Sequence, residues 1–127
     1  MFKPQASFSS FSVNDLVEAK EFYTKILHLK ITDETMGMQF ALPGGGGLFI
    51  YPKEDHEPAM FTVLNFIVED IDSAVDGLIK LGVKFEKYEG FHQDEKGIAR
   101  SKAANMGPDI AWFKDPSGNI LSVIQDK

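Results

Sequence analysis

Hydrophobic and polar positions are most regularly arranged between residues 61 and 81. Residues 61–68 are almost all apolar or β-branched, which is typical of a buried strand. An acidic turn follows, and from residue 72 onward apolar side chains recur at helical spacing as far as Leu81, just before Gly82. The pattern predicts a buried strand over 61–68, a tight turn, and an amphipathic helix over 72–81 that packs back on the strand.

The chain contains this unit twice. A shift of 55 positions superimposes matching residues of the two copies: Phe11 on Phe66, Val13 on Val68, Asp15 on Asp70, Leu16 on Ile71, Ala19 on Ala74, Lys25 on Lys80 and Ile26 on Leu81. The copies share the pattern F-x-V-x-D-[LI]-x-x-A, and the helix that follows is in phase in both. We interpret the chain as a duplicated module, and this repeat decides the expected fold.

Periodicity and turn residues predict the remaining elements. In the first copy these are a strand over 6–13, a helix from 16 to about 28, and short strands over 29–32, 38–42 and 48–51. The second copy adds strands over 83–88, 110–114 and 119–125, with a long polar loop over 89–107. We therefore expect one α+β domain over 1–127: module one over about 5–52, a linker over about 53–59 and module two over about 60–127. Each module is expected to fold as strand–helix–strand–strand–strand.

Composition and charge restrict the function classes. The 127 residues are 43% hydrophobic and 25% charged, as in an ordinary globular protein. The net charge of −6 is spread along the chain and argues against nucleic acid as a partner, because phosphate binding needs a basic face. Without cysteine there is no disulfide, thiolate nucleophile or cysteine-bound zinc. We see no signal peptide and no membrane span or membrane partner, so a cytoplasmic location is expected.

A motif near the C-terminus adds a family resemblance. Residues 113–119 read F-K-D-P-S-G-N, and V-x-D-[LI] leads into each predicted helix. Together with the repeat, these features resemble the glyoxalase/bleomycin-resistance/extradiol-dioxygenase group, also called the vicinal oxygen chelate superfamily, over nearly the whole chain. The resemblance implies two βαβββ modules whose curled mixed sheets form a cup around a small-molecule site (a glyoxalase-like fold). It also implies a homodimer, since homodimers are common in that family.

The positions that bind metal in that family hold other residues here. Metal-using relatives carry a histidine seven residues before the aspartate of V-x-D and a glutamate three residues beyond the asparagine of D-P-x-G-N. The matching positions are Phe8, Val63 and Ser122, and the repeat places Phe49 at the fourth. None offers the imidazole or carboxylate that a divalent metal needs at such a site. We therefore expect neither the usual metal site nor a cofactor.

The three histidines could rebuild a metal site elsewhere. His28 is expected at a helix end, where its imidazole suits the helix dipole. His56 and His92 have acidic neighbours in polar loops and could chelate a metal weakly, although solvated charge explains both.

Other polar features have simple structural interpretations. Residues 44–47 are four glycines followed by a strand, so we expect a hairpin loop rather than a phosphate cradle, which would open a helix. Asp15 and Asp70 are interpreted as helix caps rather than as an acid–base pair. Arg100, the only arginine, could meet an anionic ligand from the long loop, but a solvent-facing side chain is the simpler interpretation.

Strand alternation places aromatic, apolar and polar side chains on the sheet faces that are turned away from the helices. We predict that an organic ligand binds to Phe8, Ser10, Phe49, Tyr51, Val63, Asn65, Trp112, Ser122 and Ile124. Further side chains that could reach the rim or wall of the cup are Met38, Phe40, Tyr88, Met106 and Trp112. The alternative is that these residues fill a core or a subunit interface.

Three functions remain open at this point. The first resembles the bleomycin-resistance branch: a metal-free protein that sequesters a small organic compound, for which the acidic charge balance would suit a cationic aromatic. The second is a lyase, isomerase or dioxygenase of the same superfamily that uses a non-standard metal site or metal-free acid–base chemistry. The third is an interaction module that binds no ligand. The residue types at the metal positions favour the first, and with it a role other than catalysis.

Overall fold

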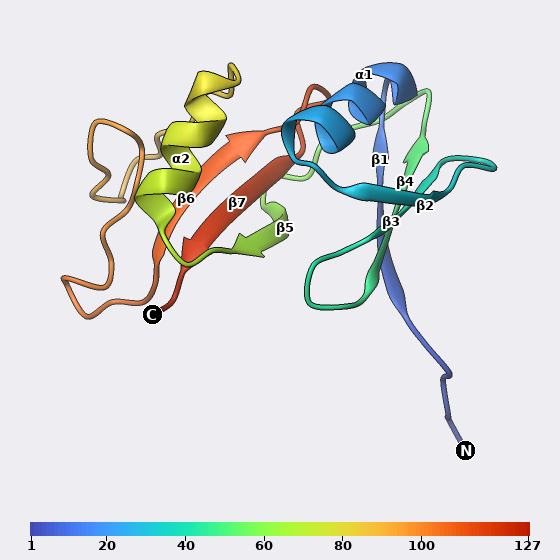
Figure 1. Ribbon diagram of the computed structural model, residues 1–127, viewed down its shortest axis with the longest axis horizontal. Helices are drawn as coiled ribbons and strands as arrows, with labels where there is room; N and C mark the ends of the chain where they lie inside the picture. The colour runs from blue at the N-terminus through green and yellow to red at the C-terminus, as the bar shows by residue number, and fades with distance from the viewer. The chain divides into compact units, whose positions relative to one another are not determined.

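Each copy of the repeat folds as a strand that runs directly into a helix. The computed structural model describes residues 1–127, in which β1 (Phe8–Val13) leads into α1 (Leu16–Glu21) and β5 (Thr62–Ile67) leads into α2 (Ile71–Lys80) (Figure 1). The chain forms two compact units, Met1–Pro58 and Ala59–Lys127, with one copy in each. The α+β prediction is confirmed, with one small mixed sheet per unit. None of the helices has both the length and the hydropathy that a membrane span requires.

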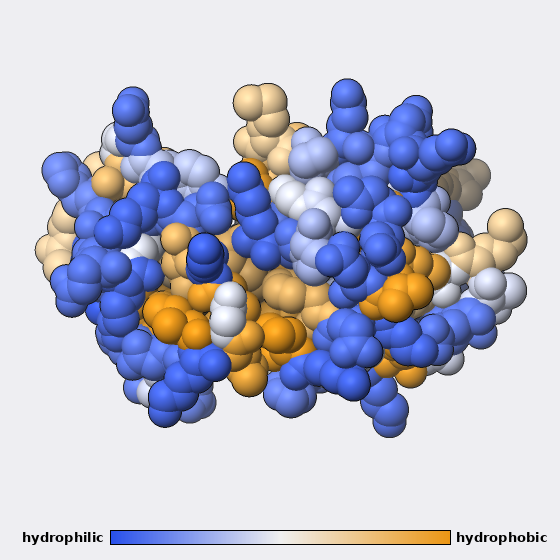
Figure 2. Space-filling view, turned by 90° about the horizontal axis from the view of Figure 1, so that it is seen from above, coloured by the Kyte–Doolittle hydropathy of each residue, from blue (hydrophilic) through white to orange (hydrophobic).

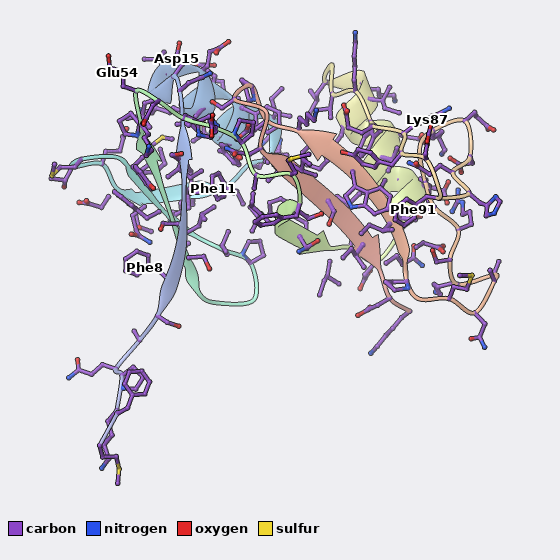
Figure 3. The ribbon with its side chains drawn as sticks, turned by 180° about the vertical axis from the view of Figure 1, so that it is seen from behind. Phe8, Phe11, Asp15, Glu54, Lys87 and Phe91 are labelled. Atoms are coloured by element: carbon purple, nitrogen blue, oxygen red, sulfur yellow. The ribbon has the colours of Figure 1, made fainter.

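Aspartates cap both helices, as the sequence predicts. The Asp15 carboxylate accepts hydrogen bonds from the backbone N–H groups of Val17 (3.0 Å) and Glu18 (3.1 Å). The Asp70 carboxylate accepts one from the backbone N–H of Ser73 (3.1 Å). These bonds satisfy amide donors that have no partner inside the helix. Figure 3 shows Asp15 where β1 ends and α1 begins, so local structure accounts for this carboxylate.

The first unit contains a four-stranded sheet in the order β1-β4-β3-β2, in which β1 runs parallel to β4 and the other pairs are antiparallel. The other three strands are β2 (Lys30–Asp33), β3 (Met38–Ala41) and β4 (Gly47–Pro52). Along β4, Leu48 and Ile50 are buried, whereas Phe49 and Tyr51 are partly exposed. One face of this sheet therefore packs into the core, and the other retains contact with solvent.

The first helix departs from the prediction in its second half. The α-helix ends at Glu21 and continues as a π-helix, η1 (Phe22–Ile26), in which the Leu27 N–H donates to the carbonyl of Phe22 (3.1 Å). His28 then adopts a left-handed conformation with φ of 56°, which ends the helix. Apolar spacing predicts that a helix exists here, but the change from α to π hydrogen bonding depends on packing.

The packing of η1 centres on the side chain of Tyr23. It lies on η1 and is completely buried. Its ring centroid is 6.1 Å from that of Phe11 on β1 and 5.9 Å from that of Phe40 on β3. The π-helix thus carries a ring that contacts two strands of the sheet.

The second unit contains a three-stranded sheet in the order β5-β7-β6, with β5 parallel to β7 and β6 antiparallel to it. Its further strands are β6 (Asp109–Lys114) and β7 (Ile120–Gln125), and α2 lies against both (Figure 1). A bulge shifts the register between Thr62 and Leu64, so that Thr62 lies opposite Ile120. Val63 falls in the bulge, because one extra residue is accommodated there.

The strand predicted over 83–88 does not form, so that prediction was wrong, and the second unit has one strand fewer than the first. Only Phe85 makes a bridge, to Phe113 on β6, and the Glu86 N–H donates to the carbonyl of Trp112 (2.8 Å). The side-chain amide of Gln93 bonds the next backbone groups instead. It accepts from the N–H of Tyr88 (2.8 Å) and donates to the carbonyl of Glu86 (2.9 Å). A side chain from the following loop thus replaces a strand ladder.

The F-K-D-P-S-G-N motif forms the turn between β6 and β7. The buried Asp115 carboxylate accepts hydrogen bonds from the backbone N–H groups of Ser117 and Asn119 (both 2.9 Å) and from the Asn119 side-chain amide (2.9 Å). Gly118 has φ of 86°, a conformation that favours glycine. The motif is therefore a turn built around one buried, fully engaged carboxylate.

Replacement of that carboxylate should be costly. We expect Asp115→Ala to lower the free energy of unfolding by about 3 kcal/mol, because three donors, two of them backbone groups, lose a charged acceptor in a buried place. Urea denaturation followed by circular dichroism measures the change. The exposed Asp126 supplies the control, since Asp126→Ala should change stability by less than about 0.5 kcal/mol. Equal effects of the two substitutions would contradict this account of the motif.

Candidate ligand-binding site

A pocket of about 400 Å³ opens on the second unit. It is lined by Met60, Phe61, Thr62, Tyr88, Phe91, Trp112 and Ile120. All belong to Ala59–Lys127, so one unit forms the whole lining. Four of the seven side chains are aromatic and none is charged. This volume and this composition are typical of sites for small organic molecules.

The ring of Trp112 forms one wall, supported by two other rings. The ring of Tyr88 meets it nearly edge-on, with centroids 5.5 Å apart and an interplanar angle of 74°. The ring of Phe91 is tilted against it, with centroids 4.9 Å apart and an angle of 58°. Phe91 comes from the loop after residue 88 (Figure 3) and remains 53% exposed. Three rings thus present apolar surface to whatever enters the pocket.

Strand ends and exposed apolar side chains complete the lining. Thr62 and Ile120 are register partners on β5 and β7, and they are placed there by the bulge described above. Met60 and Phe61 immediately precede β5 and are 95% and 68% exposed. Figure 2 shows orange, apolar areas among hydrophilic residues on the face of the molecule that it presents. Exposed apolar surface next to a pocket is characteristic of binding sites.

The Tyr88 hydroxyl is unusual among the polar groups of this site. Its oxygen is buried and has no hydrogen-bond partner. Burial raises the pKa of Tyr88 above its ordinary value of 10.0, and the nearby negative charge of Glu86 raises it further. The phenol therefore keeps its proton at neutral pH and can act as a hydrogen-bond donor.

In the first unit, the four predicted ligand-binding residues share one sheet face. Ser10 lies opposite Phe49 in the β1–β4 register, and the rings of Phe49 and Tyr51 stack 5.9 Å apart at 16°. Phe8 is 64% exposed, and Figure 3 shows it on the opposite side of β1 from Phe11. The structure thus brings Phe8, Ser10, Phe49 and Tyr51 to the solvent-facing side of this sheet. Their role in ligand binding stays a prediction.

In the second unit, Trp112 is the one predicted residue that also lines the pocket. Ser122 is completely buried and donates a hydrogen bond to the Asn65 side-chain oxygen across β5 and β7 (2.5 Å). Ile124 is half-buried on β7, and Val63 lies in the bulge of β5. These four residues lie on strands β5 and β7 and are not part of the pocket lining. Their role in ligand binding stays a prediction.

The further residues predicted at the rim or wall of the cup lie in three different places. Tyr88 joins Trp112 in the pocket, whereas Met38 and Phe40 are buried in the core of the first unit and Met106 is 82% exposed. Sequence reasoning missed Met60, Phe61, Thr62, Phe91 and Ile120 as lining residues. An available signal was Phe91 itself, an aromatic residue within an otherwise polar loop.

Arg100 is partly exposed, with 38% of its side-chain surface accessible, but carboxylates of this chain hold its guanidinium. Its guanidinium forks onto the Asp72 carboxylate in the first turn of α2, with nitrogen–oxygen distances of 3.0 and 2.7 Å. Its Nε also donates to Asp94 (3.1 Å). Lys96 adds contacts to Asp72 and Asp76 (both 3.0 Å). The hydrogen bonds from Arg100 and then Lys96 hold the pKa of Asp72 well below its usual range.

The long loop is therefore anchored, chiefly through Asp94. The Asp94 side chain accepts from the backbone N–H groups of Lys96 and Ile98 (both 2.9 Å), and Ile98 is completely buried. Burial alone would raise the pKa of Asp94, but these backbone bonds and Arg100 outweigh it and lower the pKa. Ala99 then bridges to Ile110 on β6. The loop continues the edge of the sheet over this stretch, next to α2 and β6 (Figure 1).

Comparison with known proteins identifies the family. The family model described as Glyoxalase/Bleomycin resistance protein/Dioxygenase superfamily matches residues 7–123. The chain belongs to this superfamily. No curated protein matches the chain.

Solved structures show the same fold at low sequence identity. A glyoxalase family protein from Bacillus anthracis is 19% identical, with both chains fully covered and a TM-score of 0.68. TnmS3, an antibiotic binding protein from Streptomyces sp. CB03234, is 21% identical over 99% of this chain and 100% of that one, with a TM-score of 0.68. A lactoylglutathione lyase from Agrobacterium tumefaciens is 17% identical over 97% and 95%, with a TM-score of 0.66. The fold is glyoxalase-like.

The residues present do not fit the metal site that the superfamily implies. Phe8, Phe49 and Val63 have no lone pair to donate, and the Ser122 hydroxyl is buried and bonded to Asn65. No group of three or more histidine and acidic side chains could hold a metal ion elsewhere.

Two of the histidines have other surroundings. His56 lies with its Nδ1 2.6 Å from the hydroxyl oxygen of Ser12, and His92 is exposed. Neither histidine belongs to a cluster that could hold a metal ion.

The anchoring of the loop can be tested through Arg100. We expect Arg100→Gln to lower the free energy of unfolding by about 1 kcal/mol at neutral pH, the upper end for partly exposed ion pairs, because the contact is bidentate. The pKa of Asp72 is lowered in the folded state, so this contribution is present above the ordinary value of 3.8 and is lost as pH falls through the folded pKa. The difference between wild type and variant should therefore shrink below about pH 4.

Denaturant titrations of both proteins at several pH values measure this difference. Lys25→Gln is the matched control, because Lys25 forms only an exposed pair with Glu21 (3.4 Å) and should matter little at any pH. A difference for Arg100→Gln that is constant from pH 7 to pH 3 would contradict the role assigned to the ion pair.

Proposed function

We propose that this protein is a metal-free small-molecule binding protein, which sequesters an aromatic organic compound in the pocket of its second unit. The observation that carries the proposal is the aromatic wall, in which Tyr88 and Phe91 pack on Trp112 beside an open volume of about 400 Å³. Rings in this arrangement bind flat apolar molecules through stacking and dispersion. Superfamily membership supports the proposal, since one structural neighbour is described as an antibiotic binding protein.

The lining offers no obvious machinery for turnover. It contains no histidine, acid or lysine that could transfer a proton, and no nucleophile beyond the hydroxyl groups of Thr62 and Tyr88. The residues at the superfamily's metal positions cannot bind a divalent ion. Sequestration needs only affinity, which this lining can supply. A cytoplasmic location and a homodimer remain predictions.

Binding can be followed directly because Trp112 is the only tryptophan in the chain. We expect flat aromatic compounds to change its fluorescence and to raise the melting temperature, since a ligand that binds only the folded state stabilises it. Phe91→Ala should weaken binding by about 3- to 10-fold through the loss of one ring contact. Phe2→Ala removes a ring that is 89% exposed near the N-terminus and should leave affinity unchanged.

Two outcomes would contradict the proposal. If no aromatic compound in a broad panel alters Trp112 fluorescence or the melting temperature, the pocket is not a binding site and the interaction-module alternative gains support. If the purified protein holds zinc, nickel, manganese or iron at one ion per chain, the enzymatic alternative gains support. Elemental analysis by mass spectrometry after dialysis measures the second.

A further inference from the structure

The buried hydroxyl of Tyr88 lacks a partner inside the protein. Its oxygen has no contact with solvent and no hydrogen bond, although folded proteins pair nearly all such groups. The backbone N–H of the same residue donates to the Gln93 side chain (2.8 Å), and its ring packs on Trp112. Tyr88 is thus held firmly while its only polar side-chain atom is unpaired. A group held in this way is arranged for a partner that comes from outside the chain.

The remainder of the lining narrows the chemistry of that partner. The side chains around Tyr88 in the pocket are aromatic or aliphatic, apart from the thioether of Met60 and the hydroxyl of Thr62. No carboxylate or basic group lines the pocket, so an ionic ligand would lose its hydration without gaining a counter-charge. A neutral ligand avoids that cost. Because the pKa of Tyr88 is raised, its phenol remains protonated and offers a donor.

We propose that the Tyr88 hydroxyl is the polar anchor of the pocket, and that the ligand is a neutral aromatic compound carrying a hydrogen-bond acceptor such as a carbonyl oxygen. This inference rests on the proposed binding function and specifies the ligand class for the same site. The ring of the ligand lies against Trp112, and its acceptor reaches the phenol when the atoms that cover the buried hydroxyl move aside. The proposed ligand is therefore neutral, and not the cationic aromatic compound that the acidic net charge of the chain would suit.

An isosteric pair of probes tests the anchor. 2-Acetylnaphthalene carries a carbonyl group, and 2-isopropenylnaphthalene has the same shape with a methylene group in place of the oxygen. Isothermal titration calorimetry gives the affinity of the wild-type protein for each. We expect the ketone to bind about 10-fold more tightly than the alkene. The ketone oxygen accepts a hydrogen bond from the Tyr88 hydroxyl, whereas the alkene leaves this buried donor unpaired.

Tyr88→Phe should remove this preference while it preserves the ring. The ratio of the two affinities should fall about 10-fold, because the alkene no longer leaves a donor unpaired and the ketone no longer gains a bond. Phe91→Ala is the matched control: it should weaken both probes alike and leave the ratio unchanged. The melting temperature of Tyr88→Phe should equal or exceed that of wild type, since no internal bond is lost.

Three other results would contradict the role proposed for the Tyr88 hydroxyl or for the ligand class. If Tyr88→Phe leaves the ratio of ketone to alkene affinity unchanged, the hydroxyl forms no hydrogen bond with the ligand. A lower melting temperature shows that it has a partner within the protein. A permanently charged probe, trimethyl(2-naphthyl)ammonium, that binds more tightly than the ketone overturns the neutral class. These results leave the binding function intact, whereas binding of no probe to the wild-type protein removes both proposals.

Discussion

One side-chain amide, that of Gln93, holds in place the segment that carries Tyr88. It accepts from the N–H of Tyr88 (2.8 Å) and donates to the carbonyl groups of Glu86 (2.9 Å) and Gly97 (2.7 Å). These bonds do the work of a missing strand, because they satisfy backbone groups that a sheet would otherwise pair. They also connect the loop to the segment that carries Tyr88. The position of the Tyr88 ring against Trp112 therefore depends on a loop residue that does not itself line the pocket.

The two copies of the repeat have diverged where the pocket lies. In the first unit, the segment after the helix forms the strand β2, which pairs with β3. In the second, the equivalent segment makes one bridge, at Phe85, and then continues into the anchored loop. Ion pairs between Arg100 and Asp72 join that loop to α2. An irregular segment held by side chains can present rings that a regular ladder would direct to alternate faces.

At the positions where metal-using relatives carry ligands, this chain carries side chains with structural contacts. Ser122 is completely buried and bonded to Asn65 across two strands, so its oxygen contributes to the sheet. Phe49 stacks on Tyr51 in the first unit. Phenylalanine and a bonded hydroxyl cannot hold a cation, but they can contribute apolar area and sheet stability. The shared scaffold is thus compatible with binding chemistry that differs from that of metal-using relatives.

Sequence alone determined the repeat, the aspartate caps, the turn around Asp115 and the residue types at the metal positions. These features depend on neighbours within a few positions or on chemical identity, and both can be read directly from the chain. The α+β class followed from the same patterns, and Trp112, one of the predicted ligand-binding residues, lies in the lining of the pocket. Only tertiary structure decided that residues 83–88 form no strand, that Arg100 pairs with acids, and that Phe91 meets Trp112. Those outcomes depend on where a long loop returns in space, which local periodicity does not encode.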